Sequence, residues 1–221
     1  MSNINSVVGR LATVPPSLME PAPPHRRRLP RQEREQQMLD AAVAVFSRRG
    51  FHVASMDEIA EAAGVSKPMI YAYLGSKDEL FSACIRREAR RLINLITAAA
   101  PPGLTTQQRL HQGLLAFFTF VTEHRDGWIV LYRQARAREP FAGEIAAARQ
   151  QIIALVAGLL APSSTEGAEE EVAPIAYAVV GAAEALSDWA LENLEETPEG
   201  LTRRLVDMFW TGLGRSDGRS Q

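Results

Sequence analysis

Apolar residues recur at helical spacing along most of this chain, and no segment indicates a strand. Between residues 32 and 49, apolar side chains fall at positions i, i+3, i+4 and i+7, which is the stripe of an amphipathic helix. The members of this stripe are Leu39, Ala42, Val43 and Phe46. Similar patterns predict short helices at 56–63 and 67–74, and a long helix at 77–99 that ends before Pro101-Pro102-Gly103.

The sequence pattern also predicts helices in the remainder of the chain. Five more helices are predicted, at about 105–123, 128–137, 141–160, 172–193 and 198–212. The Asp126-Gly127 pair predicts a break, and the acidic segment 163–171 predicts a loop. Alanine supplies 33 of the 221 residues, which favours helix over strand. The predicted fold class is therefore all-α, with about nine helices.

The segment Ser55–Lys77 carries helix start and stop signals at short spacing. Serine and glutamate three residues apart form two predicted capping boxes, Ser55 with Glu58 and Ser76 with Glu79. Gly64 is placed to end the first short helix with a positive φ, and Ser66 to cap the second helix. Pro68 falls in the first turn of that helix, where a missing N–H costs nothing. Two short helices joined by a glycine turn are typical of helix-turn-helix DNA-binding proteins.

Charge is distributed unevenly along the chain. From Arg26 to Arg91 there are 13 Lys and Arg against 9 Asp and Glu, whereas from Leu92 onward there are 10 against 16. The basic part carries the helix-turn-helix pattern, which is the sign expected of a region that meets phosphates. Four arginines form a basic arm before it: Arg26, Arg27, Arg28 and Arg31. This arm is either a DNA contact or a solvated linker.

Other classes of protein find less support in the sequence. No apolar run approaches the roughly 18 residues of a membrane span, and the N-terminus lacks a signal pattern, so we expect a cytoplasmic protein without membrane attachment. The single Cys84 excludes an internal disulfide and falls on the apolar stripe of the helix at 77–99. His111 and His124 lack the spacing of a metal site. We expect no metal or cofactor.

Two alternatives to a sequence-specific DNA-binding protein find less support in the residues. The chain lacks the motifs GxSxG, GxxxxGK, GxGxxG and HExxH, so an enzyme with catalytic residues is not expected. A non-specific nucleic-acid or nucleoid protein is disfavoured by the acidic C-terminal part.

The segment Ser55–Lys77 resembles the DNA-binding signature of the TetR family of bacterial transcriptional regulators. The shared positions are Ser55, Ile59-Ala60, Ala63-Gly64-Val65-Ser66, Tyr71, Tyr73 and Ser76-Lys77, and the preceding Ala42, Phe46 and Gly50-Phe51 also fit. The resemblance covers about residues 32–81. Leu74 stands where phenylalanine is usual, which is expected to repack the core, and Pro68 replaces a frequent glycine.

The resemblance implies a division of the chain into a DNA-binding and a sensing part. Residues 1–31 would be a disordered tail and basic arm, and residues 32–76 the helix-turn-helix domain. Residues 77–214 would form a helical ligand-binding and dimerisation domain, followed by a flexible tail at 215–221. The family layout implies an Ω-shaped homodimer joined through its last two helices. Small residues in Ala173–Ala190 and an apolar stripe at Leu201, Leu205, Met208 and Gly212 suit that interface, or an intramolecular core.

The recognition helix, Ser66–Leu74, provides the predicted base contacts. Lys67 can donate to guanine or to a phosphate, whereas Pro68 and Met69 offer apolar contact to thymine methyl groups. Tyr71 and Tyr73 are suited to phosphates, although packing on the domain core is the alternative for each. The remaining predicted DNA contacts are Ser55, Ser66 and Lys77 at helix N-termini, with Arg28 and Arg31 in the arm.

Aromatic residues beyond position 105 suggest a hydrophobic ligand pocket. The candidates are Phe117, Phe118, Trp128, Tyr132, Tyr177 and Trp189. For each of them a plain core role is the alternative. Arg133, Arg136 and Arg138 could meet an acyl-CoA or form a solvated helix face. The expected protein is thus a homodimeric repressor that a small hydrophobic or acyl-type ligand releases from a near-palindromic operator in double-stranded DNA. The sequence leaves activation open.

Overall fold

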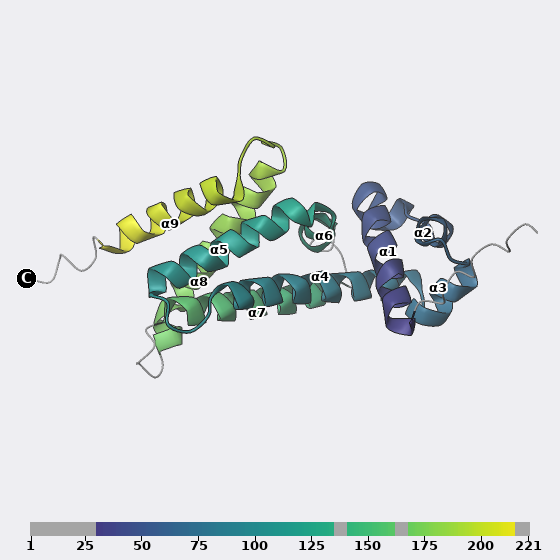
Figure 1. Cartoon of the computed structure of the whole chain (residues 1–221), viewed down its shortest axis with the longest axis horizontal. Helices are drawn as coiled ribbons and strands as arrows, with labels where there is room; N and C mark the ends of the chain where they lie inside the picture. The colour runs from purple at the N-terminus through teal and green to yellow at the C-terminus, as the bar shows by residue number, and fades with distance from the viewer. Residues whose placement is uncertain (1–29, 135–140, 162–167, 215–221) are drawn as a thin grey trace, which may run out of the picture.

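The computed structural model describes residues 30–134, 141–161 and 168–214 (Figure 1). These residues form nine α-helices and one π-helical segment, and they contain no strand. The helices are α1 (Arg31–Val53), α2 (Met56–Ala63), α3 (Lys67–Leu74), α4 (Lys77–Ala99), α5 (Thr106–Glu123), α6 (Arg125–Trp128), α7 (Ala142–Leu160), α8 (Ala168–Ala190) and α9 (Pro198–Gly214). The π-helical segment, η1, is Ile129–Gln134. The all-α fold class is confirmed.

Helices α1, α2 and α3 form a head at one end of the molecule, and α4 runs from this head into the body (Figure 1). The core of the head consists of fully buried side chains from all three helices, among them Met38, Phe46, Ile59 and Ile70. Leu80 and Phe81 in the first turns of α4 are also fully buried. The head therefore completes its core with α4, which ties it mechanically to the body.

The body is a bundle in which α4, α5, α7 and α8 pack together, while α9 covers α5 and also contacts α8 (Figure 1). Helix α6 and η1 contact both α1 and α4, so they lie where the head meets the body. Four phenylalanines join the two parts at the same place: Phe46, Phe51, Phe81 and Phe141. Phe81 and Phe141 have their ring centroids 4.8 Å apart, in the edge-on geometry that aromatic pairs prefer.

Gly50 interrupts α1 near its C-terminal end, as predicted, because its φ of 77° and ψ of 157° are non-helical, and a short turn then continues to Val53. Two other predicted boundaries in this fold were wrong. Helix α6 begins at Arg125, so Asp126-Gly127 lies within a helix, because Gly127 is buried against α4. Residues 168–171 of the predicted acidic loop belong to α8. Glutamates at the start of a helix are favoured by the helix dipole, which outweighs the loop signal of the segment.

One described helix, α7, is long and apolar enough to cross a membrane when judged by length and composition alone. Core helices of globular proteins pass the same test. In this structure α7 packs against α4, α5 and α8, and its apolar residues line internal cavities.

Candidate nucleic-acid interface and ligand cavities

The start of α2 is fixed by a serine cap. Ser55 Oγ accepts a hydrogen bond from the Glu58 backbone N–H at 3.1 Å. The Glu58 carboxylate accepts from Arg49 Nε, also at 3.1 Å, instead of returning to the Ser55 backbone. Only the serine half of the predicted capping box is thus present. The Ser55 hydroxyl faces the free N–H groups of the helix start, a position that also suits phosphate.

The turn between α2 and α3 depends on Gly64. This residue adopts the left-handed conformation (φ 64°, ψ 32°), and its N–H donates to the Ala60 and Glu61 carbonyls. Ser66 precedes α3 with extended backbone, but its side chain makes no capping hydrogen bond, so that part of the prediction was wrong. Pro68 supplies the helix start instead, because it lies in the first turn with its φ already fixed.

The start of α4 has the full capping box. Ser76 Oγ accepts from the Glu79 N–H at 3.2 Å, and Glu79 Oε2 accepts from the Ser76 N–H at 2.7 Å. The hydrogen bond from the Ser76 backbone lowers the pKa of Glu79. These two hydrogen bonds fix the backbone at the start of α4 and therefore the direction of α4 relative to the recognition helix.

One side of helix α3 is buried in the head, and the opposite side is exposed to solvent. Ile70 and Leu74 are buried in the head, while Lys67, Pro68 and Tyr71 are exposed. Met69 and Tyr73, predicted to face outward, are half-buried against α1. The Met69 sulfur accepts from Arg34 Nη1 at 3.6 Å, and the Arg31 guanidinium lies 5.2 Å from the centroid of the Tyr73 ring. The exposed face also includes Ala72, which our sequence reasoning missed although it follows Pro68 at helical spacing.

The two predicted lysine contacts are held by neighbouring groups. Lys67 Nζ lies 2.8 Å from Asp57 Oδ2, and this hydrogen bond raises the pKa of the exposed Lys67. Lys77 Nζ donates to the His52 carbonyl at 3.1 Å and lies 4.8 Å from the centroid of the Phe51 ring. A DNA group that binds Lys67 must therefore displace a carboxylate. The predicted arm residue Arg28 lies outside the described residues, whereas Arg31 begins α1.

The body contains a first cavity, the apolar cavity, between α4, α5, α7 and α8. About 30 Å³ of it is open to a water-sized sphere. Its lining is entirely apolar: Ile96, Leu110, Gly113, Leu114, Phe117, Ile152, Val156, Leu159, Val179, Val180 and Ala183. A lining of this kind has no group to orient a polar ligand, so it suits a hydrocarbon chain.

A second cavity, the mixed cavity, lies between α4, α6, η1, α7 and α8, and about 50 Å³ of it is open to a water-sized sphere. Its lining is Ala89, Leu92, Trp128, Leu131, Tyr132, Ile145, Ala148, Arg149, Ile152 and Glu184. Because Ile152 also lines the apolar cavity, the two spaces adjoin through its side chain.

The mixed cavity carries polar groups. Arg149 Nε and Nη2 bind Glu184 Oε1 and Oε2 at 2.9 and 3.2 Å, and this pairing raises the pKa of Arg149. Trp128 is buried and stacks on Tyr132 with ring centroids 4.8 Å apart. Within the described residues, the Trp128 indole N–H has no hydrogen-bond acceptor. A buried donor of this kind favours a ligand that brings an acceptor.

The predicted pocket residues separate into three groups. Phe117 lines the apolar cavity, whereas Trp128 and Tyr132 line the mixed cavity. Phe118 is fully buried and contributes to neither. Tyr177 and Trp189 are 45% and 42% exposed on α8 and also line neither cavity. Sequence reasoning missed Arg149 and Glu184, because their pairing across two helices leaves no signal in the sequence.

The remaining chemical candidates are structural. Burial raises the pKa of the Cys84 thiol to about 12, which keeps it protonated and unreactive. Among the described residues, no group of three or more His, Cys, Asp and Glu side chains could hold a metal ion. Arg133 binds Asp188 at 2.9 Å on a solvated face, while Arg136 and Arg138 lie outside the described residues.

Comparison with known proteins links both parts of the chain to one family. Residues 38–84 match the profile of bacterial regulatory proteins of the tetR family, and residues 106–212 match that of the tetracyclin repressor-like C-terminal domain. A TetR-like transcriptional regulator from Rhodococcus sp. RHA1 has a similar structure, with a TM-score of 0.73 and 48% identity. That comparison covers 85% of this chain and 99% of the Rhodococcus chain.

Further relatives resemble parts of the chain or its fold. The HTH-type transcriptional activator FasR of Mycolicibacterium smegmatis is 41% identical over 122 residues, which are 54% of this chain and 56% of FasR. The chain spans a little over half the length of FasR and of two further curated relatives. The regulator FadR of Bacillus subtilis, solved with stearoyl-CoA, shares the fold at a TM-score of 0.65 and 16% identity, covering 78% of this chain and 96% of FadR.

Proposed function

Since the chain belongs to the TetR family of bacterial transcriptional regulators, we propose that it is a homodimeric, ligand-responsive regulator that binds a near-palindromic operator. The observation that carries the proposal is the connection between its two candidate sites. Helix α4 starts at the capping box behind the recognition helix and goes on to line both cavities through Ala89, Leu92 and Ile96. A ligand that moves α4 would therefore move the recognition helix.

The DNA-binding part of the proposal assigns α3 to the major groove. Lys67, Pro68 and Tyr71 form its exposed face, and Ala72 offers a small apolar surface beside them. Ser55 and Lys77 lie at the starts of the flanking helices, where phosphate oxygens are favoured. One short helix reads few base pairs, so two copies on a palindromic site are needed for specificity.

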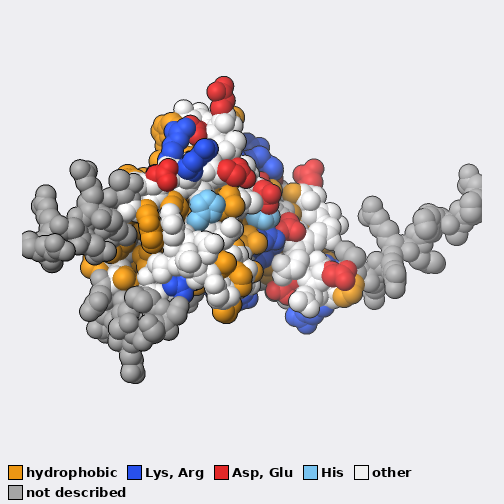
Figure 2. All heavy atoms as spheres, turned by 60° about the vertical axis from the view of Figure 1, so that its left-hand side comes forward, with side chains coloured by type: hydrophobic (Ala, Val, Ile, Leu, Met, Phe, Trp, Pro, Cys, Tyr) orange, Lys and Arg blue, Asp and Glu red, His pale blue; other side chains and the backbone are white. Residues whose placement is uncertain are grey.

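The dimer is proposed to form through the outer face of α8. Tyr177, Ala178, Ala185 and Trp189 are exposed there at helical spacing, and a side chain added to Gly181 would meet open space. By contrast, Leu201 and Leu205 of the predicted α9 stripe are buried within the protomer. Among the stripe residues whose burial is described, Met208 alone is exposed, at 58%, so a partner could cover it. On the body face seen in Figure 2, exposed hydrophobic side chains alternate with charged ones, as at many protein surfaces.

Replacing Ala185 by arginine is expected to convert the dimer into monomers, because the new charge would be buried in a face of small residues. Operator affinity should then fall by at least about tenfold, since one recognition helix binds far more weakly than two. Sedimentation equilibrium measures the first effect and mobility shift the second. Ala147→Arg, at an exposed position of α7, is the matched control. A dimeric Ala185→Arg variant would disprove this interface.

The ligand is proposed to be an amphipathic molecule with a long hydrocarbon part, such as an acyl-CoA or a fatty acid. The lining of the apolar cavity suits the hydrocarbon, while the Trp128 indole N–H and Arg149 can bind an acceptor or acidic group in the mixed cavity. The space open to a water-sized sphere is about 30 Å³ in the first cavity and about 50 Å³ in the second, so a ligand of this kind must widen both. The stearoyl-CoA bound by the FadR neighbour supports this class.

The proposed function is tested by a mobility-shift assay with the DNA upstream of the gene, titrated with stearoyl-CoA. We expect binding that resists competitor DNA and is released by the ligand. To change the bound fraction from 99% to 1%, the ligand must favour the released state by about 10⁴-fold. Binding that shows no preference over competitor DNA would instead indicate a non-specific nucleic-acid protein.

The proposed regulator represses transcription, and activation is the second candidate. The name of FasR as an activator favours the second. The ligand lowers operator affinity in the same way whether the protein represses or activates transcription. Whether release turns transcription on or off depends on where the operator lies relative to the promoter, which a reporter assay with the upstream DNA would measure.

A further inference from the structure

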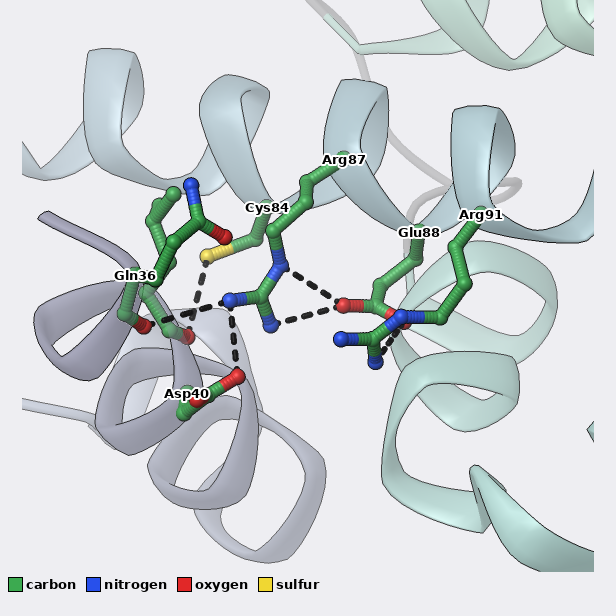
Figure 3. A network of polar contacts seen from close by, with 7 residues as sticks. Gln36, Asp40, Cys84, Arg87, Glu88 and Arg91 are labelled. Carbon is green, nitrogen blue, oxygen red and sulfur yellow. Dashed lines mark hydrogen bonds and ion pairs between the residues drawn. The ribbon is translucent and has the colours of Figure 1, made fainter. Parts of the chain in front are cut away.

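An ion-pair cluster around one buried carboxylate lies between α1 and α4 (Figure 3). At its centre is Glu88, a carboxylate that is only 1% exposed. Arg87 Nη2 lies 2.7 Å from Glu88 Oε1, and Arg91 Nη1 lies 3.3 Å from Glu88 Oε2. We call Asp40, Arg87, Glu88 and Arg91 the junction cluster. A buried carboxylate requires such partners, so Glu88 and Arg87 must move together.

Arg87 extends the cluster from α4 to the head. Its Nη1 atom lies 2.8 Å from Asp40 Oδ1 and donates to the Gln36 carbonyl at 3.3 Å, both on α1 (Figure 3). Helix α1 in turn holds the helix-turn-helix, because Gln37 donates to the Ala63 carbonyl at the end of α2 at 3.0 Å. A single guanidinium therefore joins the helix that lines the cavities to the helix that carries the DNA-binding elements.

The other side of Glu88 meets the backbone of α6. A β-carbon on Gly127 would lie 2.5 Å from Glu88 Oε2 and 3.0 Å from Glu88 Cδ. A side chain at position 127 would therefore require the Glu88 carboxylate to shift, so α6 and this carboxylate lie in close contact. The next residue in the chain, Trp128, lines the mixed cavity together with Leu131 and Tyr132 of η1.

The η1 segment is π-helical and directly follows the α-helical α6. Its i→i+5 hydrogen bonds can rewind to the i→i+4 pattern of the α-helix that precedes it, and π-helical segments are frequent at functional sites. Rewinding changes the position of Tyr132 and Leu131 relative to Gly127. A ligand that prefers one of the two arrangements shifts the population between them.

We propose that the junction cluster couples occupancy of the mixed cavity to the orientation of the DNA-binding head. The proposal rests on the proposed function and names how that site is regulated. A ligand displaces Trp128 and η1, Gly127 presses on Glu88, and Glu88 draws Arg87 away from Asp40 and the Gln36 carbonyl. Helix α1 then loses its polar hold on α4, and the head leaves the orientation that binds the operator.

A double-mutant cycle tests the coupling without any ligand. Gly127→Ala pushes Glu88 from the α6 side, and Asp40→Asn removes the carboxylate charge that pairs with Arg87 on α1, at a position exposed enough for the variant to fold. We expect each change to weaken operator binding by about tenfold, within the usual range of coupling energies. In a protein that already carries Asp40→Asn, adding Gly127→Ala should weaken operator binding by less than about a further twofold. Additive losses, about 100-fold together, would overturn the proposal.

A second measurement uses stearoyl-CoA as the probe. Asp40→Asn should bind stearoyl-CoA as the wild type does, within about twofold, while the ratio of operator Kd with and without stearoyl-CoA falls at least about fivefold. Arg86→Gln is the matched control, because Arg86 on α4 pairs at 2.8 Å with Glu144 of α7 and not with α1. An unchanged ratio in Asp40→Asn would contradict the proposal.

The outcomes separate the coupling from the proposed function. If stearoyl-CoA fails to release the wild-type protein while the cycle remains non-additive, the ligand class is wrong and the junction cluster stands. If the wild type binds no operator, the proposed function fails. The same double-mutant cycle can then be measured by hydrogen exchange of the α1 backbone amides. A non-additive rise in exchange supports the coupling, and additive changes overturn it.

Discussion

Replacing Lys67 by alanine is expected to weaken operator binding by roughly 10- to 100-fold, since a specific base contact is worth about 1–3 kcal/mol. Lys67 is the one cationic side chain on the exposed face of α3. Its ammonium group lies 2.8 Å from the Asp57 carboxylate, and that hydrogen bond raises the pKa of Lys67, which favours the charged form. Fluorescence anisotropy with labelled operator measures the effect. Arg90→Ala, an exposed charge on α4, is the control for simple loss of positive charge.

The salt dependence of the Lys67→Ala variant distinguishes base reading from phosphate contact. If Lys67 contacts a phosphate, affinity for operator and competitor DNA falls uniformly and the salt slope drops by about one. If Lys67 reads guanine, the loss is larger on the operator than on competitor DNA. Asp57→Asn should act in the opposite direction, because DNA no longer has to displace a carboxylate from Lys67. An unchanged operator affinity in Lys67→Ala would remove α3 from the proposed interface.

Short-range signals account for what the sequence predicted well in the head. The bounds of α2, α3 and α4 follow from Gly64, Pro68 and the Ser76–Glu79 box, each of which acts within one turn of a helix. Predictions from the same kind of signal were wrong where a distant contact dominates. Gly127 reads as a helix break in the sequence, but Glu88 of α4 packs against it and holds it inside α6.

Long-range packing explains why the sensing part could be predicted only in outline. The aromatic residues Tyr177 and Trp189 are indistinguishable by type from Phe117 and Trp128, yet the first pair is exposed and the second pair lines cavities. Which face of α8 turns inward is decided by its packing on α7 and α5. Arg149, which Glu184 orients across the mixed cavity, depends on the same packing and was therefore missed.

Filling the mixed cavity should separate ligand sensing from DNA binding. Ala148 lines this cavity, and its neighbour Ala147 is exposed on the same helix, so Ala148→Phe and Ala147→Phe form a matched pair. The phenyl ring would occupy space that the ligand needs beside Trp128 and Arg149. We expect Ala148→Phe to weaken stearoyl-CoA binding by roughly 10- to 100-fold, because even one methylene in an apolar pocket changes discrimination by about 1–3 kcal/mol.

Operator binding distinguishes a blocked cavity from a damaged fold in this variant. Ala148→Phe should bind the operator as tightly as Ala147→Phe and the wild type, yet stay bound at stearoyl-CoA concentrations that release both of them. Calorimetry gives the ligand affinity, and anisotropy follows release. A variant that releases the operator normally would show that the ligand does not enter the mixed cavity. If instead Ala148→Phe lowers operator affinity without ligand, the added ring itself displaces η1, and the Asp40→Asn substitution should then suppress most of that loss.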